Sequence, residues 1–387
     1  MPDLLDDLAI VDVDSHVSEP ADLWTSRAPA RWAEEAPRLK WSEAHQENRW
    51  VVGDAVLTSE AEFAYAGWTK YPPHYPPSFA DADPGAWDPT VRLERMDEYG
   101  ISAQVLYPNL VAFATYAFRQ LDPELAIWTI QAYNDFLVDF ASSDLKRLVP
   151  LMALPFWDLD AAVKEVDRAA DLGHKGILLA VHFDKVGLPP LWDAHWEPLL
   201  KRAEERELSI NFHIGFSQMT EEDRKSMMEV SGDEHARITS VNHFNNARAI
   251  ADVICTGLCA RFPKLNFVSV ESGGGWLPYL AESLDWHWKN FGAMDARKDL
   301  ELPSFYLRRQ VYGSFWFERE CLARVADLLP DNLMFETDYP HPTSLTPGPV
   351  SHAEAPREAL RKAMVGVDET VVRKLLHDNA ARVYHLD

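Results

Sequence analysis

An aspartate and a histidine stand two positions apart at the end of an apolar run, VDVDSH, residues 11–16. Residues two apart in a strand face the same side, so Asp14 and His16 are expected to point together toward one face. Three more polar residues end other apolar runs: His213 in NFHIG, Glu271 in VESGGG and Asp338 in ETDYPH. Buried charges without partners are costly, and a shared divalent cation would compensate them.

Two imidazoles and two carboxylates around one ion, with a position left open, are typical of Zn²⁺ and also suit Mn²⁺. We therefore predict one divalent ion, Zn²⁺ in preference to Mn²⁺, bound by Asp14, His16, His213 and Asp338. Glu271 is predicted to be a general acid/base, with Asp338 taking part in catalysis as well as ligation. The alternative is a hydrogen-bonded structural cluster. Each motif alone is weak, and only their recurrence at several strand ends favours the metal.

Four other residues are candidates for contact with a substrate. His182 ends the run LAVHF, His341 follows Asp338 by three positions, His243 precedes a helix in VNHFNNAR, and Trp276 begins the helix after a triple glycine. Surface or core histidines, and core packing of the tryptophan, are the alternatives. The triple glycine lacks the Lys-Ser/Thr of a phosphate loop, and a tight strand-to-helix turn explains it.

Eight apolar runs are available to position these side chains: 8–16, 101–108, 147–155, 175–183, 208–216, 266–274, 309–317 and 332–341. Most are continuously apolar, as expected for strands covered on both faces. Helical patterns alternate with them, such as 158–173, which starts with Asp and ends with Gly. The alternation predicts a parallel (β/α)₈ barrel over residues 1–387 as a single domain. A doubly wound open sheet is the alternative, and it would not need eight units.

In the sixth run, strand alternation assigns Phe267, Ser269 and Glu271 to one face, and Val268 and Val270 to the other. The aliphatic pair suits packing against the outer helices. The sequence therefore predicts that the first set faces the barrel interior, which would bring Glu271 to the metal.

Two segments do not fit the repeat, an insertion over 19–88 and a charged loop over 217–240. Both leave from the carboxyl ends of strands, where barrel enzymes keep their chemistry. The insertion contains WTKYPPHYPPSF and is predicted to be ordered but irregular. Its aromatic residues suggest an apolar or ring-bearing substrate, with the insertion acting as a lid or as an interface to a neighbouring subunit.

Composition limits the partners. A net charge of −24 argues against nucleic acid and anionic membranes. The acidic N-terminus is unlike a signal peptide, and no run has the length of a membrane span. Cys255, Cys259 and Cys321 have neither zinc-binding spacing nor a disulfide pattern, which favours a cytoplasmic location. The 14 Trp and 12 Tyr exceed the needs of a core, which favours a homodimer or higher homo-oligomer.

The chain resembles the amidohydrolase-related family, in the branch of aminocarboxymuconate-semialdehyde decarboxylase and γ-resorcylate decarboxylase. The resemblance runs from about residue 10 to the C-terminus and rests on DVDSHVSEPADLW, RLERMDEYGISAQVLYP, AYNDFL, NFHIG, ARFPKLNFVSVESGGGWLPYLAESLD, NLMFETDYPHP and NAARVYHL. It implies a barrel of the metal-dependent hydrolase type. It also implies one metal held by the strand-one pair, the strand-five His and the strand-eight Asp. Glu271 stands where characterised decarboxylases of this branch carry a histidine acid/base.

The resemblance favours a metal-dependent non-oxidative decarboxylase, a carboxy-lyase, of a small unsaturated or aromatic acid. The cation would bind the carboxylate and a neighbouring oxygen, and Glu271 would protonate the carbon that loses CO₂. Residue chemistry alone leans slightly to hydrolysis of an amide, ester or lactone, because a Glu beside a metal-activated water suits that reaction. A hydratase and a non-catalytic binding barrel are weaker alternatives.

Overall fold

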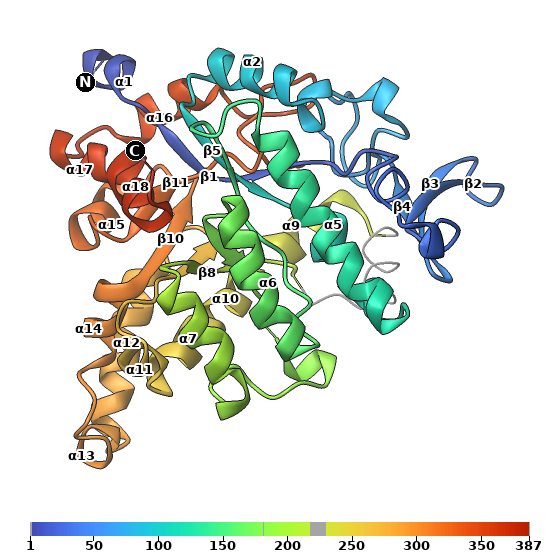
Figure 1. Cartoon of the computed structure of the whole chain (residues 1–387). Coiled ribbons are helices and arrows are strands. Elements are labelled where there is room, and N and C mark those ends of the chain that lie inside the picture. Colours follow the sequence, from blue (N-terminus) through green and yellow to red (C-terminus); the bar gives the residue numbers. More distant parts are fainter. Residues whose placement is uncertain (1, 181, 217–229, 387) are drawn as a thin grey trace.

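The computed structural model describes residues 2–180, 182–216 and 230–386 (Figure 1). Each of the eight predicted runs contains a strand of the barrel. These strands are β1 Val11–His16, β5 Ala103–Tyr107, β6 Leu148–Pro150, β7 Gly176–Leu178, β8 Ser209–His213, β9 Phe267–Val270, β10 Val311–Phe315 and β11 Leu333–Phe335.

All neighbouring barrel strands pair in parallel, in the orders β1-β5-β6 and β7-β8-β9-β10-β11. Single bridges join the two groups: Met152 with Ile177 between β6 and β7, and Ser15 with Tyr339 between β1 and the chain after β11. The amide of His16 donates to the Tyr339 carbonyl at 2.6 Å across the second junction. The sheet therefore closes into an eight-stranded barrel, and the open-sheet alternative was wrong.

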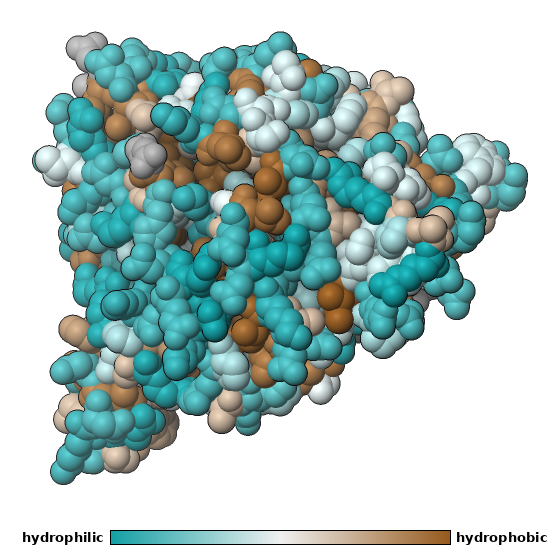
Figure 2. Space-filling view, in the orientation of Figure 1, coloured by the Kyte–Doolittle hydropathy of each residue, from teal (hydrophilic) through white to brown (hydrophobic). Residues whose placement is uncertain are grey.

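Helices follow the strands and cover the outside of the barrel, with α5, α6 and α7 on the face shown in Figure 1. That face is mainly hydrophilic, with small separated hydrophobic patches (Figure 2). The helix α6 shows the predicted signals: Asp158 accepts a hydrogen bond from the Ala161 amide at 2.9 Å, and Gly173 ends the helix with φ 111°. The longer helices are α2 Pro89–Tyr99, α5 Pro123–Ala141, α6 Leu159–Leu172, α7 Glu197–Glu205, α10 His243–Cys255, α12 Leu277–Asn290, α14 Pro303–Gln310, α15 Leu322–Leu328 and α16 Pro356–Ala363.

Shorter helices complete the chain: α1 Pro2–Asp7, α3 Leu110–Phe113, α4 Thr115–Phe118, α11 Leu258–Arg261, α13 Ala293–Ala296, α17 Glu369–Arg373 and α18 Asn379–Tyr384. In the predicted charged loop, residues 217–229 lie outside the described residues, and α9 Gly232–Thr239 occupies most of the remainder. In the described part of the chain, every helix is too short or too polar to cross a bilayer.

The segment between β1 and α2 carries a three-stranded antiparallel sheet, β2 Arg38–Ser42, β3 Glu47–Val52 and β4 Ala55–Ser59. It projects from one edge of the molecule in Figure 1. The prediction of irregular structure was wrong for these residues. Charged residues interrupt β2 and β3, and Trp41 of β2 is 55% exposed, so these two strands lack the continuous apolar runs of barrel strands, while β4 is a short run that begins with two residues that are not buried. Residues 60–78, which hold most of the Pro- and Tyr-rich stretch, are turns and bends.

Candidate active site and metal centre

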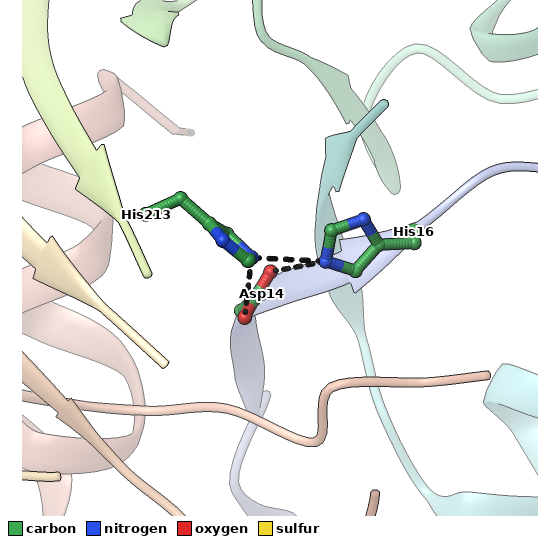
Figure 3. A group of neighbouring side chains, drawn as sticks. All are labelled: Asp14, His16 and His213. Atoms are coloured by element: carbon green, nitrogen blue, oxygen red, sulfur yellow. Dashed lines mark hydrogen bonds and ion pairs between the residues drawn. The ribbon is translucent and has the colours of Figure 1, made fainter. Parts of the chain in front are cut away.

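Three predicted ligands meet at the carboxyl ends of β1 and β8 (Figure 3). Nε2 of His16 lies 3.0 Å from Nε2 of His213. Oδ1 of Asp14 lies 3.5 Å from Nε2 of His16, and Oδ2 of Asp14 lies 3.6 Å from Nε2 of His213. All three residues are buried, at 1% exposure or less. These separations suit a shared ion, because two donors each about 2.1 Å from one ion lie about 3.0 Å apart at 90° and about 3.4 Å apart at the tetrahedral angle.

Hydrogen bonds to main-chain carbonyls fix the tautomers of both histidines. Nδ1 of His16 lies 3.0 Å from the Pro108 oxygen, and Nδ1 of His213 lies 2.7 Å from the Ile214 oxygen. A carbonyl can only accept, so each Nδ1 carries a hydrogen, and Nε2 is the nitrogen that each ring offers to a metal ion. Metal-binding histidines use this same arrangement, in which the second ring nitrogen donates to an oxygen.

Asp338 adds a second carboxylate after β11, with Oδ1 at 3.7 Å from Nε2 of His16. Asp14 and Asp338 are both 0% exposed, and none of their four carboxylate oxygens accepts a hydrogen bond from the described residues. Buried carboxylates are normally saturated with donors. Four orphaned oxygens beside two facing imidazole nitrogens therefore fit a divalent cation.

Glu271 joins the group with Oε2 at 3.5 Å from Nε2 of His213, and its side chain is 11% exposed. We call Asp14, His16, His213, Glu271 and Asp338 the cluster. Possible metal-binding groupings of three side chains include Asp14, His16 and His213, and also Asp14, Glu271 and Asp338. The structure thus brings together all five residues that sequence analysis placed at strand ends.

The predicted orientation of β9 was wrong. The Ser269 hydroxyl accepts a hydrogen bond from the Asn246 amide of α10 at 3.0 Å, so it faces the outer helices. Val270 is in register with His213 and shares its inward direction. Ser269 of β9 therefore bonds to a buried amide outside the barrel, while Val268 and Val270 face the barrel interior.

Glu271 reaches the cluster for a different reason than strand alternation. The strand ends at Val270, and Glu271 has φ 52°, in the left-handed region. Asp338 follows β11 with φ 59°. Such values are strained for non-glycine residues and concentrate at functional sites. The two backbone reversals therefore turn both carboxylates toward the shared centre.

The cluster carries more negative charge than its buried surroundings favour. Burial raises the pKa of Asp14 and of Asp338, and neighbouring carboxylates raise the second further. Burial also raises the pKa of Glu271 to about 8, although His213 opposes the shift. For His213 burial lowers the pKa, but Asp14 and Glu271 outweigh it and bring the pKa to about 9. For His16 burial lowers the pKa well below its usual value. A bound cation would relieve the repulsion among these carboxylates.

Asp12, which was not predicted from the sequence, holds the segments of Asp14 and Asp338 together. Its Oδ1 accepts hydrogen bonds from the Thr337 amide at 2.8 Å and the Asp14 amide at 3.2 Å, and its Oδ2 accepts from the Thr337 hydroxyl at 2.5 Å. Asp12 thereby fixes β1 beside the chain that leads into Asp338. The repeated spacing Asp-x-Asp-x-His was the available signal.

Glu336 was also missed. It is fully buried, and one of its oxygens accepts a hydrogen bond from the Glu271 amide at 3.1 Å, while the Ser314 hydroxyl accepts from the same amide at 3.0 Å. These two acceptors hold the reversed backbone at Glu271. Glu336 comes one residue after β11, where only the later Asp338 attracted notice.

His341 lies against the cluster. Its ring stacks on His16 with centroids 3.8 Å apart, and Nδ1 lies 2.9 Å from Oδ1 of Asp338. Nε2 lies 2.8 Å from the side-chain oxygen of Asn109. Glu19 in turn accepts hydrogen bonds from the amides of Asn109 at 3.1 Å and Leu110 at 2.8 Å. The start of the insertion therefore fixes the loop that holds His341.

A cavity of about 830 Å³ opens beside the cluster, and Glu271, Asp338 and His341 are in its lining. The other three candidates for substrate contact are absent from its described lining. His182 bonds to Asn245 at 3.0 Å, and the rings of His243 and Trp276 stack with centroids 6.5 Å apart. Contact of these three with a substrate stays a prediction.

Several known proteins are similar to this chain in sequence or in fold. The chain is 24% identical over 379 residues to 2-amino-3-carboxymuconate-6-semialdehyde decarboxylase of Dictyostelium discoideum, which covers 95% of this chain and 91% of the relative. It superposes on a solved amidohydrolase from Mycobacterium avium subsp. paratuberculosis K-10 with TM-score 0.76 and 21% identity, over 98% of both chains. A dihydroxybenzoic acid decarboxylase from Polaromonas sp. JS666, solved with manganese and the inhibitor 2-nitroresorcinol, matches with TM-score 0.62 and 17% identity over 98% of this chain and 97% of its own.

The sequence profile described as amidohydrolase matches residues 11–386, from the first barrel strand to the C-terminus. This match spans every strand that contributes to the cluster. The chain belongs to the amidohydrolase family.

Proposed function

We propose that the protein is a metal-dependent non-oxidative decarboxylase of an unsaturated or aromatic carboxylic acid. One observation carries the proposal: two imidazole nitrogens face each other at 3.0 Å beside buried aspartates whose carboxylate oxygens accept no hydrogen bond among the described residues. The decarboxylases of Dictyostelium and Polaromonas to which the chain is similar support the reaction type.

Asp14, His16, His213 and Asp338 would hold one divalent ion. The mixed nitrogen and oxygen donors favour Zn²⁺, and the manganese in the Polaromonas relative supports Mn²⁺ as the alternative. When bound, the ion supplies Lewis-acid polarisation of the acid group and of a neighbouring substrate oxygen. It also neutralises charge that the buried carboxylates impose on one another.

Glu271 is proposed as the general acid. As the bond from carbon to the carboxylate breaks, CO₂ leaves, the electron pair remains on the carbon, and the carboxyl of Glu271 delivers a proton there. Its place in the lining of the cavity and its amide, held by Ser314 and Glu336, support this role. His341 is proposed to contact the substrate, since it lines the same cavity and is fixed by Asn109.

The residues around the cluster support a ring-bearing substrate. Phe63 and Phe113 stack with centroids 5.6 Å apart, and both line the cavity. We propose that the chain is one domain in which the insertion over 19–88 serves as a lid. Tyr65 and Tyr71 of the insertion support this role because they line the cavity.

Hydrolysis of an amide, ester or lactone is the second candidate, and it rests on Glu271. A carboxylate that can accept a proton beside a metal suits activation of water as well as donation to carbon. The test is to incubate the zinc- and manganese-loaded protein with hydroxybenzoates, lactones and amides, and to measure CO₂ together with acid release. CO₂ from a hydroxybenzoate is expected. Cleavage of a lactone or amide with no CO₂ from any acid would replace the proposal by the hydrolase.

We also propose a homodimer or higher homo-oligomer in the cytoplasm. Support for assembly comes from α12 and the turn into α13, where Tyr279, Trp286 and Phe291 are 75%, 65% and 83% exposed. These elements form a protruding corner at the lower left of Figure 1. Support for the cytoplasm comes from three cysteines that are all free thiols.

A further inference from the structure

The cavity at the cluster is larger than a single-ring acid requires. Its volume is about 830 Å³, within the range of pockets for drug-sized ligands. An apolar cavity of about 150 Å³ already holds one benzene molecule. Space beyond the cluster therefore remains after an acid group and one ring are placed beside Asp338 and Glu271.

Aromatic side chains from two further segments line the same cavity. Trp316 and Phe317 follow β10 with their rings 4.5 Å apart, and the indole of Trp316 donates to the Thr343 carbonyl at 3.3 Å. Tyr71 and Pro72 of the insertion line the same cavity. Phe317 is 61% exposed and Tyr71 is 56% exposed. Large exposed apolar surface in a cavity continuous with a reaction site is typical of ligand contact.

The charges of this lining leave little for a charged ligand group to bind. Arg319 is the single Lys or Arg among the described lining residues. Its guanidinium lies 2.9 Å from the Glu354 carboxylate, which also pairs with Lys362. The rest of the described lining holds apolar residues such as Leu345 and Val350, uncharged polar residues, the carboxylate of Glu62 and the imidazoles of His235 and His352. A neutral group is therefore favoured there over an anion.

We propose that the substrate is a carboxylic acid with a neutral apolar body larger than one ring. Its acid group reaches the cluster, and its body lies against Phe317 and Tyr71. The inference rests on the proposed function for the position of the acid group. The size and neutrality of the body rest on the cavity itself.

The test compares affinities of four acids for the metal-loaded, full-length Glu271→Gln variant by calorimetry, so that no ligand is consumed. The probes are salicylate, 3-hydroxy-2-naphthoate, 3-phenylsalicylate and 3-hydroxy-7-sulfo-2-naphthoate. 3-Hydroxy-2-naphthoate and 3-phenylsalicylate, whose second ring is uncharged, are expected to bind at least about tenfold more tightly than salicylate. The second ring leaves water and packs against aromatic side chains. The sulfonated acid is expected to lose that gain.

Phe317→Ala and Tyr71→Ala should each reduce the gain of the two-ring acids, while the Kd of salicylate stays within about twofold. Both side chains are largely exposed, so folding should tolerate their removal. Trp41→Ala is the matched control, because Trp41 is 55% exposed in the same insertion and is absent from the cavity lining. Equal affinity for one-ring and two-ring acids would overturn the inference, and so would a gain that survives in a double variant with both Phe317→Ala and Tyr71→Ala.

The two proposals fail separately. If two-ring acids bind more tightly but the wild-type protein releases no CO₂ from any of them, the proposed decarboxylase activity is wrong and the proposal on the substrate body stands. If the protein releases CO₂ from salicylate but binds one-ring and two-ring acids equally, the proposal on the substrate body is wrong and the proposed decarboxylase activity stands.

Discussion

Nε2 of His16 and Nε2 of His213 lie 3.0 Å apart, and Nδ1 of each ring donates a hydrogen bond to a main-chain carbonyl. Two lone pairs at this separation are stable only when a cation, a proton or a metal ion, lies between them. A proton on His213, whose pKa is about 9, can occupy this place in the metal-free protein. The metal would replace that proton, so metal binding should release a proton and weaken as pH falls.

Metal removal should lower thermal stability. Without the ion, the buried carboxylates of Asp14 and Asp338 lose the charge that compensates them. Free metal at about 100 times its Kd should add about 2.7 kcal/mol to the free energy of unfolding. Calorimetric scans of chelator-treated protein, with and without restored Zn²⁺ or Mn²⁺, measure the effect. Identical Tm values in all three samples would contradict a metal bound at the cluster.

Asp338→Ala should lose metal and turnover together, because it removes a buried ligand of the ion. The buried Asp14 carboxylate then loses the positive charge that compensates it. Elemental analysis of the purified variant and its rate of CO₂ release are the measurements. Asp331→Ala is the control, since Asp331 pairs with Lys374 at the surface. Asp338 leaves the proposed ligand set if the variant keeps its metal.

Glu271→Gln should keep its metal and lose about 10²–10⁴-fold in kcat, because the amide preserves the shape of the side chain but transfers no proton. The control is Glu282→Gln, an exposed position on α12. Metal content and CO₂ release are measured on the same preparation. Normal turnover would make Glu271 a structural residue.

Glu19 should impose a pH dependence on stability. Burial raises its pKa from 4.5 to about 7, although four main-chain N–H groups oppose the shift. Between these two values the folded protein holds a proton that the unfolded chain has released. The free energy of unfolding therefore falls as pH rises from about 4.5 to 7, by up to about 3 kcal/mol at 1.36 kcal/mol per pKa unit.

Glu19→Gln cannot ionise, so its contribution should be constant across this window. Urea unfolding at pH 5 and pH 7.5 measures the difference between variant and wild type, with exposed Glu94→Gln as the control. The variant should gain stability relative to wild type as pH rises. A difference that does not change with pH would show that Glu19 titrates normally.

Trp286→Glu should weaken self-association, because it places a charge within the exposed aromatic surface of α12. Light scattering at micromolar concentration should give a mass above 44.0 kDa for the wild type and a shift toward 44.0 kDa for the variant. Trp41→Ala, at the far edge of the insertion sheet, should leave the mass unchanged. A mass of 44.0 kDa for the wild-type protein at all concentrations would contradict the proposed homo-oligomer.

The barrel and most of the cluster were predictable because their signals are local. Continuous apolar runs mark strands covered on both faces, and a polar residue at the end of such a run lies at the carboxyl edge of a parallel sheet. This reasoning located Asp14, His16, His213 and Asp338. It missed β2, β3 and β4, because charged residues interrupt β2 and β3 and because β4 is a short run that begins with two residues that are not buried.

The amino-acid sequence by itself determined which segments form the barrel strands and which polar side chains stand at their ends. Only the tertiary structure decided which way those side chains turn. Ser269 faces outward because Asn246 of α10 meets it there, and Glu271 turns inward through a left-handed backbone held by Glu336 and Ser314. Strand periodicity specifies alternation but not which face is the interior. That choice depends on partners distant in the sequence, as does the bond of Asp12 to Thr337 across 325 positions.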